Sequence, residues 1–122
     1  MPKIIVVDDD KTSTTLFEQV LLMNKYEVVT LNESAKTVET AIEEQPDLII
    51  LDLMMPDPDG FKVCRMLRAD PQFRRTPIII VTALNDLDSK LVAMGAGAND
   101  YLVKPFHIEQ LFAILDKQLK RS

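Results

Sequence analysis

The sequence has 122 residues, of which 47% are hydrophobic and 27% are charged, which suffices for one hydrophobic core but not for two ordinary domains. Its formal net charge of −5 argues against direct nucleic-acid binding, because no basic excess is present to neutralise phosphates. No apolar run approaches the ~18 residues of a membrane span, and the first residues lack the apolar region of a signal peptide. With one cysteine, Cys64, no internal disulfide forms, so we expect one cytoplasmic domain over residues 1–122.

The first half of the chain is predicted to alternate strands with helices. Residues 3–7 are apolar and β-branched, as in a buried strand, and they end at the run Asp8 to Asp10. Residues 12–24 have helical periodicity. The expected apolar face of this helix is made by Leu16, Val20 and Met23, with Phe17 and Leu21 beside them. A less apolar strand over residues 26–31 is expected at a sheet edge.

A second helix is predicted over residues 32–45, because Asn and Ser open the segment as good caps. Its expected apolar face contains Ala35, Val38, Ala41 and Ile42. Residues 48–51 then form an unbroken apolar run bounded by turn residues, which is typical of a strand covered on both faces. A single carboxylate, Asp52, stands where this strand ends.

The second half repeats the alternation. A stiff loop containing Pro56, Pro58 and Gly60 precedes a third helix that ends near Asp70. A fourth strand over residues 78–81 ends at Thr82. The weakly helical segment 84–98 has Leu87, Leu91 and Met94 on one side, and the strand 100–103 that follows it ends at Lys104. The last helix, over residues 108–120, has an apolar face made by Leu111, Ile114, Leu115 and Leu119.

Strands that alternate with helices in this way predict an α/β fold, with a parallel five-stranded sheet covered by helices on both faces. Right-handed crossovers place the carboxyl ends of all strands along one edge. Ligands bind at that edge in open α/β sheets. The polar residues that end the strands are therefore the candidate functional site.

These polar residues favour phosphoryl transfer to a carboxylate. The aspartates at residues 8–10 and Asp52 would repel one another, and a divalent cation relieves that repulsion. An all-oxygen ligand set in a small site favours Mg²⁺. Lys104 and Thr82 would add a positive charge and a hydroxyl around an oxyanion. Asp52 needs no general base, because it is already ionised.

The sequence resembles the receiver domain of two-component response regulators, of the chemotaxis-regulator type, over essentially all of its length. The matching segments are IIVVDDD, LIILDLMMPDPDG, IIIVTA and GANDYLVKPF, which occur in order at the ends of the alternating strands. The resemblance implies a flavodoxin-like, doubly wound (βα)5 fold with strand order 2-1-3-4-5.

The resemblance also implies an acceptor and a metal site. Asp52 matches the phospho-acceptor of the family. Asp9, Asp52 and the backbone carbonyl of Met54 match its Mg²⁺ ligands, and Asp8 is expected to reach the ion through a water molecule.

Three further positions match the residues with which the family senses the phosphoryl group. Lys104 is expected to pair with that group and Thr82 to hydrogen-bond it. Tyr101 matches the switch aromatic, which turns inward when Thr82 moves. The Lys104–Pro105 peptide matches one that is cis in the family.

The implied function is phosphorelay signalling. A sensor histidine kinase or a histidine phosphotransfer protein would donate the phosphoryl group to Asp52 while docked against the first helix and the Pro105 loop. The fourth helix, fifth strand and fifth helix would then control an effector protein or output domain. We expect the chain to catalyse only its own phosphorylation and dephosphorylation, and so not to be an enzyme with an external substrate.

Some alternatives stay open at this point. The chain is either a single-domain regulator or the amino-terminal part of a longer one, and either a monomer or a phosphorylation-dependent dimer. The opening IIVVDDDKT also fits an aspartate-nucleophile phosphatase of the haloacid-dehalogenase type, in which Asp8 would be the nucleophile and Asp10 the acid. That reading lacks the late acidic motif, has no room for a cap domain and gives Asp52 no role. A binding module that is never phosphorylated is disfavoured because every reactive position is present.

Overall fold

The backbone forms a five-stranded parallel sheet in a computed structural model that describes residues 1–119. The strands are β1 (Lys3–Val7), β2 (Glu27–Leu31), β3 (Leu48–Leu51), β4 (Ile78–Thr82) and β5 (Asp100–Val103). Their spatial order is β2-β1-β3-β4-β5, which confirms the predicted order and the edge position of β2.

The described residues form five α-helices, of which the first four connect consecutive strands and the last follows β5: α1 (Lys11–Met23), α2 (Thr37–Glu44), α3 (Gly60–Ala69), α4 (Leu87–Gly95) and α5 (Ile108–Leu119). Two short 3-10 helices, η1 (Ser34–Lys36) and η2 (Pro71–Phe73), precede α2 and β4. The predicted extension of the last helix to Lys120 lies outside the described residues. Within residues 1–119, no helix has both the length and the apolar character needed to cross a membrane.

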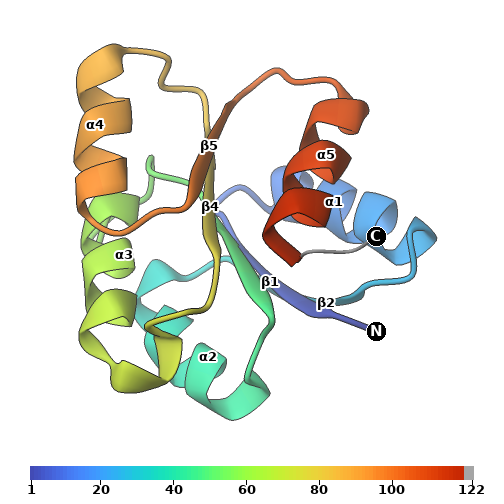
Figure 1. Ribbon diagram of the computed structural model, residues 1–122, viewed down its shortest axis with the longest axis horizontal. Helices are drawn as coiled ribbons and strands as arrows, with labels where there is room; N and C mark the ends of the chain where they lie inside the picture. The colour runs from blue at the N-terminus through green and yellow to red at the C-terminus, as the bar shows by residue number, and fades with distance from the viewer. Residues whose placement is uncertain (120–122) are drawn as a thin grey trace.

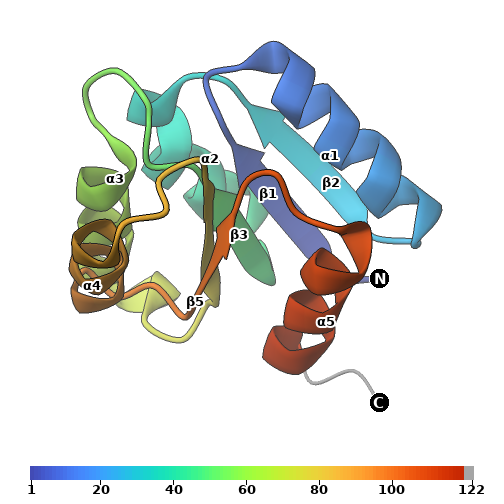
Figure 2. The same ribbon diagram turned by 90° about the horizontal axis from the view of Figure 1, so that it is seen from above.

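The helices cover both faces of the sheet, as Figures 1 and 2 show. On one face, α1 and α5 pack against alternate strand residues such as Ile4 and Val6. On the other face, α2, α3 and α4 pack against the intervening residues, such as Ile5 and Val7. Both sets of strand side chains are therefore buried, which explains why the strand sequences are apolar without alternation.

Aspartates begin three of the helices and so define the loops that follow β1, β3 and β4. Asp10 caps α1 by accepting a hydrogen bond from the Thr12 amide at 3.0 Å. Asp59 caps α3 in the same way, and Asp86 caps α4. Because an N-cap fixes where the chain turns into the helix, these caps also define the path of the loops next to the candidate site.

The predicted buried face of α1 is only partly correct, because Phe17 and Leu21 are buried but Leu16 and Met23 are not. Leu16 and Met23 are 57% and 83% exposed, whereas Thr14, Phe17 and Leu21 are buried. The helix carries apolar side chains on more than one stripe, so periodicity alone does not select the packing face. In the structure the Phe17 ring faces the β5–α5 loop, with its centroid 5.9 Å from that of Phe106.

The predictions for α4 and α2 need similar corrections. Helix α4 begins only after its Asp86 cap, and the chain beyond it turns at Gly97, whose φ is 113°. The predicted apolar side of α4 faces solvent, because the helix packs on the sheet through small residues such as Ala93.

Helix α2 is shortened by the preceding 3-10 turn and by the left-handed Gln45. On its predicted face Ala41 is buried, but Ala35 and Ile42 are exposed.

Candidate functional site

Two carboxylates and one ammonium group meet at the carboxyl edge of the sheet. Asp8 and Asp52 follow β1 and β3, and they are only 3% and 8% exposed. Lys104 follows β5, and its Nζ lies 2.8 Å from Oδ2 of Asp8 and 3.3 Å from Oδ2 of Asp52. The structure thus brings together three residues from three strand ends, as the predicted topology requires.

Backbone amides orient both carboxylates. The Met54 amide donates to Oδ1 of Asp52 at 3.1 Å, and the Asp10 amide donates to Oδ1 of Asp8 at 3.0 Å. The Oδ2 atom of each aspartate is directed at Lys104. Each carboxylate therefore has one oxygen bound to its own loop and one oxygen facing the shared centre of the site.

Burial and charge act in opposite directions on these groups. Burial raises the pKa of Asp8, although the hydrogen bond from Lys104 acts against the increase. Burial by itself would lower the pKa of Lys104, but the hydrogen bond to Asp8 and the charge of Asp52 outweigh it, so that the Lys104 pKa lies above its ordinary value. Lys104 is therefore a permanent cation at neutral pH.

Thr82 and Tyr101 are joined through Leu84, in the loop that follows β4. Thr82 is fully buried, and its Oγ1 accepts a long hydrogen bond, 3.4 Å, from the Leu84 amide. The Tyr101 hydroxyl donates to the carbonyl oxygen of Leu84 at 2.8 Å. One loop residue therefore contacts both predicted switch residues. Burial raises the pKa of Tyr101, and the negative charges of Asp86 and Asp52 add to this effect.

The remaining predicted ligands lie on the solvent side of this cluster. Asp9 and Met54 are exposed, and within residues 1–119 no three acidic, histidine or cysteine side chains converge into a ready-made metal site. The donor set nevertheless fits Mg²⁺, which is ordinarily held by one or two carboxylates and completed by water and phosphate oxygens. The Lys104–Pro105 peptide bond is cis, and so is the bond between Asp57 and Pro58.

Gly60 has a role that the sequence analysis did not assign to it. A Cβ atom at this position would lie 2.1 Å from the carbonyl oxygen of Asp52 and 2.6 Å from Cα of Leu53. The first turn of α3 thus packs directly against the backbone that carries Asp52. The sequence indicated a turn here, but the close approach depends on how α3 meets the end of β3.

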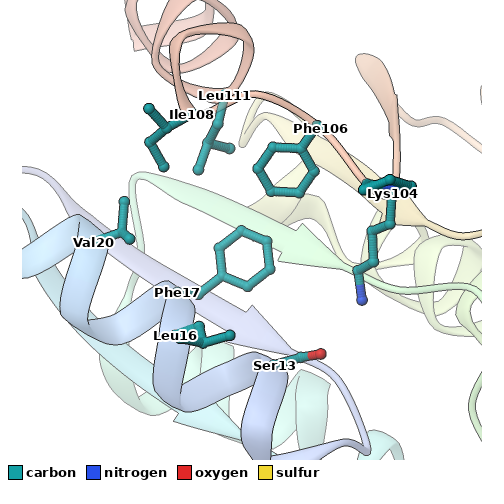
Figure 3. Close-up of a pocket in the computed structure, with 9 residues that line it drawn as sticks. Ser13, Leu16, Phe17, Val20, Lys104, Phe106, Ile108 and Leu111 are labelled. Atoms are coloured by element: carbon teal, nitrogen blue, oxygen red, sulfur yellow. The ribbon is translucent and has the colours of Figure 1, made fainter.

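An apolar groove lies next to Lys104, between α1 and the start of α5 (Figure 3). Its volume is about 280 Å³. The lining includes Leu16 and Val20 from α1, Phe106 from the β5–α5 loop and Ile108 from the start of α5. The side of α1 that the sequence analysis expected in the core therefore contributes to an open groove.

Comparison with known proteins agrees with this geometry. The family model described as "Response regulator receiver domain" matches residues 4–116. The DNA-binding dual master transcriptional regulator RpaA of Synechocystis is 39% identical over 122 residues, which are all of this chain and 51% of that protein. The chain therefore spans about half the length of this relative.

Solved structures show the same fold. The BeF3-activated N-terminal receiver domain of Klebsiella pneumoniae RstA has a TM-score of 0.91 at 33% identity, covering 98% of this chain and 99% of that one. The receiver domain of the sensor histidine kinase PA1611 of Pseudomonas aeruginosa, which has a magnesium ion coordinated in its active site cleft, has a TM-score of 0.90 at 32% identity and covers 98% of each chain.

The fold and the strand-end site define a receiver-type signalling module. The chain belongs to the response regulator receiver domain family, whose members act in phosphorelay signalling by two-component systems.

Proposed function

We propose that Asp52 accepts a phosphoryl group and that the free chain and the phosphorylated chain are the two states of a signalling switch. The observation that carries this proposal is the meeting of Asp8, Asp52 and Lys104 at one edge of the sheet. Asp52 is oriented by the Met54 amide, and its Oδ2 faces the shared centre. It is the carboxylate at the end of the central strand β3.

In this mechanism, an Asp52 oxygen forms the new bond to phosphorus while the bond from phosphorus to the donor nitrogen or oxygen breaks in line with it. Lys104 pairs with one phosphoryl oxygen, and the Thr82 hydroxyl donates to another. No proton has to leave Asp52, because the attacking group is a carboxylate. Water later cleaves the acyl phosphate and restores the free aspartate.

Mg²⁺ is the proposed cofactor. Asp9, Asp52 and the Met54 carbonyl would hold it, with Asp8 acting through a water molecule. Its bound charge would offset the negative charge on the transferring phosphoryl oxygens. Asp8 and Asp52 would orient it from the two loops that bear them, while Lys104 would exchange its carboxylate partners for the phosphoryl group.

The test is the intact mass of the protein after incubation with acetyl phosphate and Mg²⁺. We expect a single phosphoryl adduct on the native chain, no adduct on Asp52→Asn, and loss of the adduct when the ion is removed with a chelator. Unchanged labelling of Asp52→Asn would contradict the assignment of the acceptor.

A second variant separates this mechanism from the haloacid-dehalogenase reading. Under the receiver mechanism, any adduct formed on Asp8→Asn is still at Asp52, because Asp8 only helps to hold the ion. An adduct mapped to Asp8 in the native protein, or steady release of free phosphate from Asp52→Asn, would instead support the phosphatase.

The donor is proposed to be a histidine kinase or a histidine phosphotransfer protein that docks in the groove between α1 and α5. Lys104 forms part of the groove lining, and its Nζ contacts Asp52. A partner seated in the groove would therefore stand beside the acceptor. The apolar lining by Leu16, Val20 and Ile108 suits an apolar stripe on a partner helix.

The output surface is proposed to be α4, β5 and α5. Leu87, Leu91 and Val92 are exposed on α4, and Tyr101 in β5 contacts the β4–α4 loop. When Thr82 moves toward the phosphoryl group, the contact through Leu84 would change and Tyr101 would turn inward. The phosphoryl charge at Asp52 would in this way bias a surface that contacts an effector protein or an output domain.

The chain's net charge of −5 disfavours direct contact with nucleic acid, so any DNA-binding output would belong to another domain or protein. Such a regulator would act in the cytoplasm, as a single domain of the chemotaxis type or within a longer regulator. Phosphorylation-dependent dimerisation would use the α4 and α5 surface.

A further inference from the structure

The segment between β2 and α2 is hydrogen-bonded to the loop that carries the N-terminal aspartates. The Nδ2 atom of Asn32 donates to the carbonyl oxygen of Asp8 at 2.8 Å and to Oγ1 of Thr14 at 3.0 Å. Both amide hydrogens of Asn32 are thereby used. The Asp8 amide also donates to the carbonyl oxygen of Leu31, at 3.1 Å. The end of β2 and Asn32 therefore bind the Asp8 backbone on both sides of its Cα atom.

Thr14 extends this connection into the first turn of α1. It is 2% exposed, and its hydroxyl donates to the carbonyl oxygen of Lys11 at 3.1 Å. A chain of hydrogen bonds therefore runs from Asn32 through Thr14 to Lys11. Asn32 therefore binds the start of the loop over residues 8–11 directly, through Asp8, and its end indirectly, through Thr14 and Lys11.

Ser34 makes a matching contact with the loop that follows Asp52. Its side chain is buried, and its hydroxyl donates to the carbonyl oxygen of Pro56 at 3.1 Å. Pro56 lies two residues beyond Met54, whose carbonyl is a proposed Mg²⁺ ligand. The same short segment is therefore bonded to both loops that carry the proposed metal donors.

We propose that Asn32 and Ser34, with Thr14 as an intermediary, are positioning residues that hold the two acidic loops at the separation Mg²⁺ requires. We call these three residues the β2–α2 strap. The inference rests on the proposed function and adds to it the residues that preorganise the metal site. None of the three residues touches the phosphoryl group or its acceptor.

The physical reason is the geometric demand of the ion. Mg²⁺ requires near-ideal octahedral geometry, whereas surface loops lose conformational entropy when they are ordered. Residues behind the ligands commonly change metal affinity by about 10–100-fold when they act directly on a ligand side chain. The strap acts on the backbone of the loops, so a smaller effect of about three- to tenfold is expected for its loss.

The test is Mg²⁺ binding by isothermal titration calorimetry to the native protein, Asn32→Ala and Ser34→Ala. We expect the dissociation constant to rise about three- to tenfold in each variant. Asn24→Ala is the matched control, because Asn24 is an exposed asparagine at the far end of α1, and it should bind Mg²⁺ like the native chain.

A change in Mg²⁺ affinity without a change in the labelling rate at saturating Mg²⁺ distinguishes a positioning role from a general structural defect. In acetyl phosphate labelling, the Mg²⁺ concentration that gives half-maximal rate should rise as the dissociation constant does. The rate at saturating Mg²⁺ should stay close to the native rate, because Asp52, Lys104 and Thr82 are unchanged. A fall in the saturated rate without a change in half-saturation would overturn the inference.

A double-mutant cycle tests the route through Thr14. Thr14→Val keeps the shape of the buried side chain and removes the hydroxyl that links Asn32 to Lys11. If the strap is one connection, the double variant Asn32→Ala/Thr14→Val should bind Mg²⁺ no more weakly than Asn32→Ala alone. If the losses of Mg²⁺ affinity in the two single variants multiplied in the double variant, Asn32 and Thr14 would act independently, and the route through Thr14 would be overturned.

Hydrogen exchange in the metal-free protein tests the strap without any ion. The Asp10 amide donates to the Asp8 carboxylate, and its exchange should accelerate severalfold in Asn32→Ala but not in Asn24→Ala. Native exchange at Asp10 together with native Mg²⁺ affinity in Asn32→Ala would overturn the strap. If the native protein itself bound no Mg²⁺ and took up no phosphoryl group, the proposed function would fail, whatever the exchange result.

Discussion

A methyl group at residue 60 would collide with the backbone that bears the proposed acceptor. The built Cβ lies 2.1 Å from the Asp52 carbonyl oxygen, and that oxygen belongs to main chain rather than to a side chain that can turn away. Relief would require α3 to move from the end of β3. The absence of a side chain here is therefore part of how Asp52 is placed.

We expect Gly60→Ala to lower the free energy of unfolding by about 1–3 kcal/mol, in the range of overpacked sites, and to slow labelling of Asp52 by acetyl phosphate. Gly95→Ala is the control, because a Cβ at Gly95 meets nothing within 4 Å. That variant should be neutral or more stable by up to about 1 kcal/mol, since alanine favours a helix over glycine. Urea denaturation measures the free energy of unfolding of both variants. Equal losses of stability in the two variants would contradict a specific close approach at Gly60.

At the scale of single elements, the start of α4 depends on one carboxylate. Asp86 accepts hydrogen bonds from the amide and the hydroxyl of Ser89, each at 2.9 Å. The backbone hydrogen bond, and then the hydroxyl, lower the Asp86 pKa below its ordinary value. A group whose pKa is depressed by folding stabilises the fold above its unfolded pKa, and that contribution is lost as the pH falls through the folded pKa.

We therefore expect α4 to fray at acidic pH before the sheet opens. Amide exchange at Ser89 should accelerate as the pH falls below about 4, the ordinary range of an aspartate, after correction for intrinsic exchange rates. In Asp86→Asn, which keeps one oxygen acceptor but does not titrate, this additional acceleration should vanish. A native-like pH profile in Asp86→Asn would show that another group controls the end of the helix.

Arg68 connects several elements at the opposite end of the sheet from the candidate site. Its guanidinium donates to the carbonyl oxygens of Gly97, Phe73 and Thr76 and to Oδ1 of Asn99. These contacts join α3 to the η2 segment, the start of β4 and the connection between α4 and β5. Burial lowers the pKa of Arg68. Each of its guanidinium nitrogens nevertheless donates to at least one carbonyl or amide oxygen.

We expect Arg68→Met to destabilise the protein by about 2–4 kcal/mol, because it leaves several carbonyl groups without their donor. Arg68→Lys should recover little of this loss, because a point ammonium cannot reproduce the planar fork. Arg65→Met, on an exposed position of the same helix, should change stability by less than about 0.5 kcal/mol. Chemical denaturation gives these values, and full rescue by lysine would contradict the geometric argument.

At the scale of the whole molecule, the two faces of the sheet lead to two different surfaces. The α1 and α5 face presents the groove beside Lys104, while α4 on the other face presents exposed leucines. Strand β5 links the two sides, because Tyr101 in the strand contacts the β4–α4 loop and Lys104, directly after the strand, contacts Asp8 and Asp52. The proposed docking groove and the α4 part of the proposed output surface therefore lie on opposite faces of the sheet, and helix α5 borders the groove.

We expect Leu16→Asp, which places a charge in the groove lining, to slow phosphoryl transfer from phosphorylated histidine phosphotransfer proteins by about tenfold or more. Labelling by acetyl phosphate should stay at the native rate, because that small donor does not use the groove. Leu22→Asp, at an exposed position of α1 outside the groove lining, is the matched control. Equal loss with both donors would place the effect of Leu16 in the chemistry rather than in docking.

The sequence by itself determined the five strands, their order through the family resemblance, and the polar residues at their carboxyl ends. Strands covered on both faces require continuous apolar runs, so the runs ending at Asp8, Asp52 and Thr82 left little choice of conformation. Parallel connection then brings their ends to one edge, whatever the details of the packing. The meeting of Asp8, Asp52 and Lys104 follows from that topology.

The predicted apolar face of α5 is the one that packs in the core, but only the tertiary structure decided which faces of α1 and α4 are buried and how the loops are held. Helix α1 has apolar residues on two stripes, and the face bearing Phe17 rather than Leu16 packs inward because Phe106 and α5 lie above it. Asn32 looked like a helix cap in the sequence, but its partners are residues 8 and 14, which folding alone brings near it. Periodicity reports the local repeat of a helix, whereas packing partners and long-range hydrogen bonds depend on where the other elements lie.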